Sequence, residues 1–297
     1  MARKPHSYNY LSHFDHYVPS VADLFILLVW FVVGVLLGNI VTLIVPLVAG
    51  DSVPLEYTLL LSYPLMFIPA MIYASVKSRS NSMKSGGLKV DSDNFRPKSG
   101  LLCAAVAMLA TMALSFLCDA VTSAMPPMPE WLEAALDSMT QSTIWVNFIC
   151  VSIFAPVFEE WLCRGMVMRG LIGKGVKPVW AIVISALFFA VIHANPWQAI
   201  PAFLIGCMLG YVYYKTGSLK LTMLMHFTNN TLSLVLSNIE SLKDMDSWNE
   251  VLPAPAYWIV FAACLMLSFL SVRFFGSIPL KSPEGNFDSV PGLFEQV

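Results

Sequence analysis

Long apolar runs separated by short polar connections dominate this chain. Eight runs have the character of membrane helices: about Leu24–Leu47, Leu59–Val76, Leu101–Cys118, Ile144 into the first charged motif, Val179–Ile192, Trp197–Tyr214, Leu219–Leu236 and Tyr257–Phe275. A membrane helix needs roughly 20 apolar residues, with a range of about 17–25. The pattern therefore predicts an all-α, polytopic membrane bundle of about eight transmembrane helices, with a short amphipathic piece over Pro129–Met139 before the fourth.

Composition narrows the class of protein further. Hydrophobic residues make up 57% of the 297 residues and charged residues only 12%, with a mean hydropathy of +0.68, whereas soluble domains carry about 25% charged residues. No basic block suggests nucleic-acid binding, so membrane lipids are the expected surroundings. The six cysteines form no CxxC pair and are expected to be packing residues.

The distribution of charge predicts the orientation in the membrane. If all eight runs span, the connections on one side receive all but two of the 17 basic residues, the exceptions being Arg164 and Lys243. Basic residues stay on the cytoplasmic side, so we expect both termini to be cytoplasmic. The first twenty residues lack the apolar stretch of a cleavable signal, and the first run is expected to remain as a membrane helix.

Ionisable groups within membrane helices are costly and by default mark function. The first such group is Glu159-Glu160, followed by Arg164. Glu160 and Arg164 are four residues apart, share a helix face and are expected to pair. Cys163 lies four residues after Glu159 and offers no charge, so Glu159 is the carboxylate without a local counter-ion. It is the better candidate for a general base.

Two further polar groups interrupt later apolar runs. His193 ends one run, with Phe189 four residues earlier on the same face and able to pack against the imidazole. His226 and Asn230 are also four residues apart, and both can donate hydrogen bonds towards one point. Each group alone has a plain structural interpretation as a core histidine, an interhelical amide or a register-fixing ion pair. Their occurrence on three successive runs favours a shared site.

These residues can hydrolyse an acyl bond. Glu159, helped by His193, can take the proton from water, while His226 and Asn230 stabilise the oxyanion. Neither a GxSxG elbow nor an HExxH zinc helix is present. Cys163 is a less favoured nucleophile because of its apolar setting.

The motifs Glu159-Glu160-xxx-Arg164, Phe189-xxx-His193 and His226-xxx-Asn230 resemble the CPBP family of intramembrane proteases, which includes the CAAX prenyl proteases and the bacteriocin-processing (Abi) proteins. The resemblance implies a bundle of eight membrane helices around a conical cavity. It implies the catalytic roles given above, with Glu160 and Arg164 as a supporting structural pair. The chain then divides into an N-terminal tail with three helices (1–143), a catalytic core (144–238), and a last helix with a polar tail (239–297).

Several alternatives stay open at this point. The cofactor is either none or zinc, with Glu159, His193 and His226 as candidate ligands; Asn230 suits a metal-free oxyanion hole better. The resemblance implies a membrane-associated or lipidated peptide as substrate, and the short loops are typical of bacterial relatives in the cell membrane. The other hypotheses are a non-catalytic scaffold or bacteriocin immunity protein and a transporter or proton channel. His193 falls near the outer end of its run and His226 near the inner end, so only tilted helices or an interfacial stretch over Arg169–Val176 bring them level.

Overall fold

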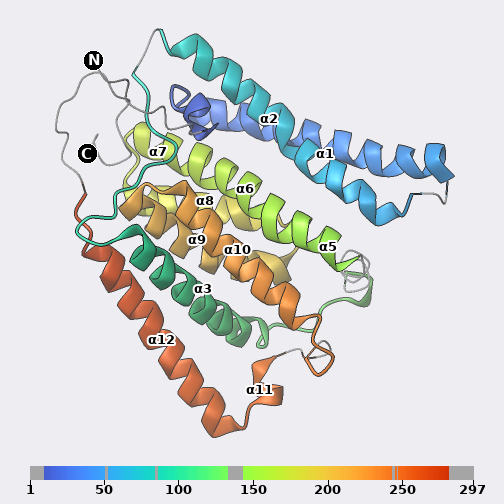
Figure 1. Cartoon of the computed structure of the whole chain (residues 1–297), viewed down its shortest axis with the longest axis vertical. Helices are drawn as coiled ribbons and strands as arrows, with labels where there is room; N and C mark the ends of the chain where they lie inside the picture. The colour runs from blue at the N-terminus through green and yellow to red at the C-terminus, as the bar shows by residue number, and fades with distance from the viewer. Residues whose placement is uncertain are drawn as a thin grey trace.

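The structure is a computed structural model that describes residues 10–50, 53–83, 86–132, 143–242, 245 and 247–280. Within these residues it is helical with no strand (Figure 1), which confirms the all-α prediction. The main helices are α1 (Val21–Ala49), α2 (Leu59–Asn81), α3 (Gly100–Thr122), α8 (Pro178–Val191), α9 (Pro196–Thr216), α10 (Leu219–Leu236) and α12 (Ala254–Gly276). Most of the predicted amphipathic piece over Pro129–Met139 lies outside the described residues.

A further helix runs without a break over Ile144–Gly173, and its hydrogen-bond register changes along its length. It comprises α5 (Ile144–Asn147), α6 (Ala155–Glu160) and α7 (Arg169–Gly173), joined by two π-helical segments, η4 (Phe148–Phe154) and η5 (Trp161–Met168). Wide π turns within α-helices occur frequently at functional sites. The two glutamates lie on the α-helical stretch between these two segments.

Five helices within the described residues are long and apolar enough to cross a membrane: α1, residues 56–81 including α2, α3, Ile144–Gly173 and α12. The expected count of eight is therefore not confirmed. Helix α8 has only 14 residues, while α9 and α10 are long enough but too polar to meet the same standard. In α10 a histidine and two asparagines lower the hydropathy. These five apolar helices are the structural evidence for an integral membrane protein.

Figure 1 shows the Ile144–Gly173 helix inside the bundle, with the α1–α2 hairpin on one side and the α3–α12 pair on the other. Burial agrees with that arrangement. In the Ile144–Gly173 helix 56% of the membrane window is buried, against 17–33% in the four outer spans. The outer helices expose large apolar side chains such as Phe25 and Leu47, as expected of surfaces that face lipid.

The α1–α2 hairpin is held by close backbone contact. A Cβ atom added at Gly34 would collide with the carbonyl oxygen of Met66, and one at Gly38 would lie 3.0 Å from that of Ser62. Small residues four apart let membrane helices approach closely, which replaces the hydrophobic driving force that lipid cannot supply. The two glycines thus fix α2 against α1 at the turn that contains Tyr63.

Helix ends are set by short polar residues. Ser20 and Asp23 form a capping box at the start of α1, and the side chains of Ser99, Asn195 and Ser218 accept backbone hydrogen bonds at the starts of α3, α9 and α10. These oxygens satisfy backbone donors that a helix leaves free at its N-terminus.

Arg169 joins several segments at the end of the bundle where α2 ends and α3 begins. It is fully buried and donates hydrogen bonds to the carbonyl oxygens of Gly165, Leu88 and Tyr17. The predicted topology places Arg169 in a connection between two membrane helices, whereas in the structure the helix continues through it to Gly173. Its guanidinium instead satisfies carbonyl groups in the polar segments that close this end.

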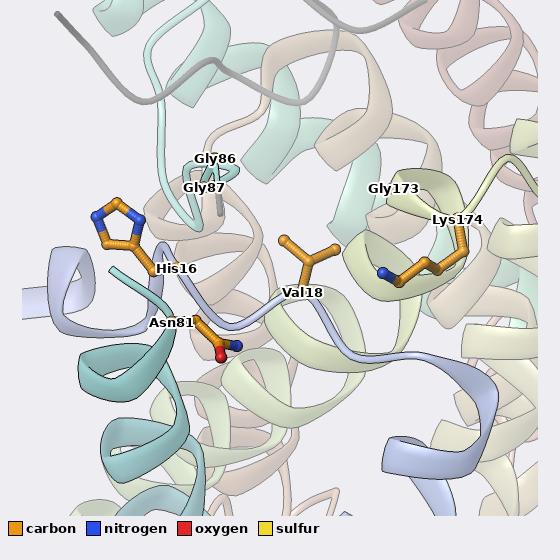
Figure 2. Close-up of a pocket in the computed structure, with 7 residues that line it drawn as sticks. All are labelled: His16, Val18, Asn81, Gly86, Gly87, Gly173 and Lys174. Atoms are coloured by element: carbon orange, nitrogen blue, oxygen red, sulfur yellow. The ribbon is translucent and has the colours of Figure 1, made fainter. Parts of the chain in front are cut away.

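A cavity of about 200 Å³ lies beside this closure, lined by His16, Val18, Asn81, Gly86, Gly87, Gly173 and Lys174 (Figure 2). None of the residues of the three sequence motifs lines it. The candidate site therefore lies elsewhere, around Glu159.

Candidate active site

Glu160 and Arg164 form a fully buried ion pair. Arg164 Nη1 lies 2.7 Å from Glu160 Oε1, the pairing that the i, i+4 spacing predicts. Arg164 Nη2 donates to the carbonyl oxygen of Gly206 at 2.9 Å, and the guanidinium carbon lies 4.8 Å from the centre of the Phe189 ring. A side chain at Gly206 would crowd this guanidinium, since a Cβ there would lie 3.2 Å from Nη2. The cation is thus held by a carboxylate, a carbonyl and an aromatic face.

Glu159 lies one residue away and faces different partners. Its Oε1 accepts a hydrogen bond from the hydroxyl of Tyr63 on α2 at 2.5 Å. Its Oε2 is buried, lacks a hydrogen-bond partner among the described residues, and lies 3.9 Å from Nε2 of His226. The sequence left Glu159 without a partner on its own helix, and the fold supplies partners from α2 and α10.

His226 lies between the two carboxylates. Its Nδ1 is 3.2 Å from Glu160 Oε1 and its Nε2 faces Glu159 Oε2. A carboxylate only accepts hydrogen bonds, so Nδ1 carries the proton when it bonds to ionised Glu160. The same Glu160 oxygen accepts from Arg164 and His226, which links the buried cation to the imidazole that faces Glu159.

His193 follows the end of α8 and is oriented by its own helix. Its Nδ1 lies 2.7 Å from the carbonyl oxygen of Phe189, so Nδ1 is the donor and Nε2 has the free lone pair of the neutral ring. The Phe189 ring meets His193 edge to face at a centroid distance of 5.0 Å and His226 likewise at 5.3 Å. Both histidines therefore reach the same phenyl ring, although they fall near opposite ends of their predicted helices.

Asn230 is held by a chain of polar side chains. Ser115 on α3 donates to Asn229 Oδ1 at 2.7 Å, and Asn229 donates to Asn230 Oδ1 at 3.0 Å. Asn230 Nδ2 in turn donates to the carbonyl oxygen of Val151 in η4 at 2.8 Å. One N–H of the Asn230 amide remains for a ligand.

The carbonyl of Val151 is available because of a proline. In η4 the backbone N–H of Ala155 bonds to the carbonyl of Cys150, five residues back. The same register would pair residue 156 with Val151, but Pro156 has no N–H. A neighbouring helix satisfies the freed carbonyl, as is usual for proline in membrane helices. Asn230 thus bonds to a carbonyl of the wide helix turn that has a proline, and no N–H donor, opposite it in this register.

The zinc site considered from the sequence is not preformed among the described residues. No three His, Cys, Asp or Glu side chains lie together as a metal-binding group in the part of the chain that the structure describes. The candidate zinc ligands Glu159, His193 and His226 therefore do not form a metal-binding group as they are placed here.

Cys163, the other nucleophile considered, is fully buried. The backbone carbonyl of this residue accepts a hydrogen bond from Ser185 at 2.8 Å, and its side chain packs in the small cluster that contains Phe189 and Ala202. It behaves as a packing residue.

Sequence reasoning missed two residues that contact the predicted site, Tyr63 and Asn229. Tyr63 belongs to the second apolar run, where nothing in the spacing connects it to Glu159. Asn229 is adjacent to Asn230 in the third motif, and the two consecutive amide side chains were the sequence signal that could have identified it.

Comparison with known protein families points to the same part of the chain. Residues 141–232 match the model of the family described as type II CAAX prenyl endopeptidase Rce1-like. The matched segment contains all three motifs, so the resemblance to CAAX proteases is confirmed there, while α1, α2, α3 and α12 lie outside it. No curated protein and no solved structure matches the chain.

Proposed function

We propose that this integral membrane protein is an endopeptidase that uses Glu159 to activate water against a peptide bond of a membrane-associated, CAAX-like substrate. The observation that carries the proposal is the environment of Glu159. One carboxylate oxygen is fixed by Tyr63, while the other is buried, without a hydrogen-bond partner among the described residues, and next to an imidazole. The family match over 141–232 supports the same class of reaction.

The chemistry follows from these positions. Glu159 Oε2 takes a proton from water as the water oxygen bonds to the scissile carbonyl carbon. The carbonyl π electrons move to oxygen and form an oxyanion. When the C–N bond breaks, the proton held by Glu159 passes to the leaving amine, so protons and charge balance over the cycle.

His226 and Asn230 are proposed as the oxyanion donors and His193 as the residue that assists the base. The free N–H of Asn230 is one donor. Since Nδ1–H of His226 is directed at Glu160, its Nε2 donates only in the imidazolium form. His193 presents Nε2 as an acceptor, which suits it to orient the attacking water. Preorganised donors of this kind are each worth a factor of about 10²–10³ in rate.

A lipid-facing groove next to this site supports a lipidated or strongly apolar substrate. It has a volume of about 450 Å³, is lined by Phe14, by α2 residues from Ile68 to Val76 and by Phe158, and is apolar except for Ser75. Phe158 directly precedes Glu159. A hydrocarbon chain in this groove would therefore lie along α2, beside the helix that carries the glutamate.

The proposal is tested with purified wild type and Glu159→Gln in detergent micelles. The substrate is an internally quenched peptide with an S-farnesyl cysteine followed by three residues, and an unprenylated copy is the matched control. We expect cleavage by the wild type, a loss of at least about 10²-fold in Glu159→Gln, and no loss with a chelator. Equal cleavage by the two proteins would refute the role of Glu159 and favour a non-catalytic scaffold. Loss with the chelator alone would indicate a metalloprotease.

A further inference from the structure

Among the described residues, Tyr63 makes the hydrogen bond to Glu159 that comes from outside the family-matched segment. Its hydroxyl donates to Glu159 Oε1 at 2.5 Å, and α2, which contains it, precedes that segment by more than 50 residues. Hydrogen bonds to an ionised acceptor are shorter and roughly twice as strong as those between neutral groups. The contact therefore orients the carboxyl group of Glu159 from a second helix.

The surrounding helices hold Tyr63 in place. Gly34 and Gly38 of α1 pack on the carbonyl groups of residues 62, 65 and 66, directly around it. One turn further along α2, the Phe67 ring stacks on that of Phe158 at a centroid distance of 5.3 Å and an interplanar angle of 14°. The hydroxyl is therefore presented to Glu159 by a backbone contact on one side and an aromatic stack on the other.

The contact distinguishes the two oxygens of Glu159. Oε1 accepts from Tyr63, whereas Oε2 is buried without a hydrogen-bond partner in the described part of the chain and faces His226. We propose that Tyr63 is the positioning residue of this site: it holds Oε1 so that Oε2 is the oxygen that receives the proton from water. The inference rests on the proposed function and extends the site to α2.

Kinetics of Tyr63→Phe test the role. This change removes the hydroxyl and keeps the ring, so apolar packing on Phe67 remains. With the farnesylated peptide we expect kcat to fall about tenfold or more, the range for losing one hydrogen bond to a charged group, with KM within about twofold of the wild type. Tyr73→Phe is the matched control, on the same helix about 15 Å away, and should retain wild-type kcat. An unchanged kcat in Tyr63→Phe overturns the proposal, as does a lower melting temperature with unaltered kinetics.

An infrared measurement tests the contact without any activity. The difference spectrum between wild type and Glu159→Gln isolates the carboxyl stretching band of Glu159. The same pair in the Tyr63→Phe background should show that band at a shifted frequency, and in the Tyr73→Phe background at the wild-type frequency. An identical band in all three backgrounds overturns the proposal. If the wild type cleaves no peptide but the band shifts, the proposed function fails for that substrate while the Tyr63 contact stands.

Discussion

Removing the buried cation Arg164 offers a quantitative test of the site's framework. Arg164→Met deletes the charge that pairs with Glu160 at 2.7 Å and the hydrogen bond to Gly206, while an unbranched apolar side chain remains over Phe189. Glu160 is then left fully buried, with the imidazole of His226 as its remaining side-chain partner. Breaking such a pair from one side typically costs about 3–5 kcal/mol, whereas replacing both partners with apolar or neutral groups is often close to neutral.

The double variant Glu160→Gln/Arg164→Met supplies the comparison. We expect Arg164→Met to lower the free energy of unfolding by about 3–5 kcal/mol and the double variant to recover at least half of that loss. The assay is reversible denaturation by SDS in bicelles, followed by tryptophan fluorescence. A loss below about 1 kcal/mol, which is typical of exposed ion pairs, would refute the buried-pair reasoning. So would a double variant no more stable than Arg164→Met.

Three further outcomes follow from named contacts. Gly34→Leu should separate α1 from α2 and reduce both stability and kcat, because even a Cβ at this position meets the backbone carbonyl of Met66. Wild-type melting and rates in this variant would contradict the packing. Burial raises the pKa of the Asp15 carboxyl, so the stability that its protonated form contributes is present at low pH and is lost as the pH rises through the raised pKa. Asp15→Asn should therefore gain stability relative to wild type as the pH rises through that value, and parallel melting-versus-pH curves would contradict this. Asn230→Ala should lower the melting temperature less in a Pro156→Ala background, where the backbone N–H of residue 156 can donate to the carbonyl oxygen of Val151. Additive losses in a double-mutant cycle would contradict the role given to Pro156.

The helix pattern was predictable to within a few residues where the sequence carries strong signals. Predicted Leu219–Leu236 coincides with α10, and predicted Leu24–Leu47 lies inside α1. Capping serines and a glycine in the left-handed region, Gly217 with φ +63° between α9 and α10, explain this agreement. Hydropathy alone does not confirm the count of eight membrane helices, because α8 is short and the polar side chains of α10 reduce its apolar character.

The contacts of the candidate site were likewise predictable only in part. Contacts within one helix, such as Glu160 with Arg164 and Phe189 with His193, follow from i, i+4 spacing. Contacts between helices do not, because they depend on tertiary packing: Tyr63 is an ordinary aromatic residue in an apolar run until α2 meets Glu159. The two glycines at 34 and 38 were a sequence signal for that packing. The buried Arg169 had no such signal, since a basic residue near a helix end usually marks an exposed connection.

The most direct test of the account is the rate at which wild type and Glu159→Gln release the last three residues from an S-farnesylated quenched peptide, measured with melting curves that show both proteins folded. The account predicts turnover by the wild type and a loss of at least about 10²-fold in the folded variant. Equal turnover by both proteins would contradict it.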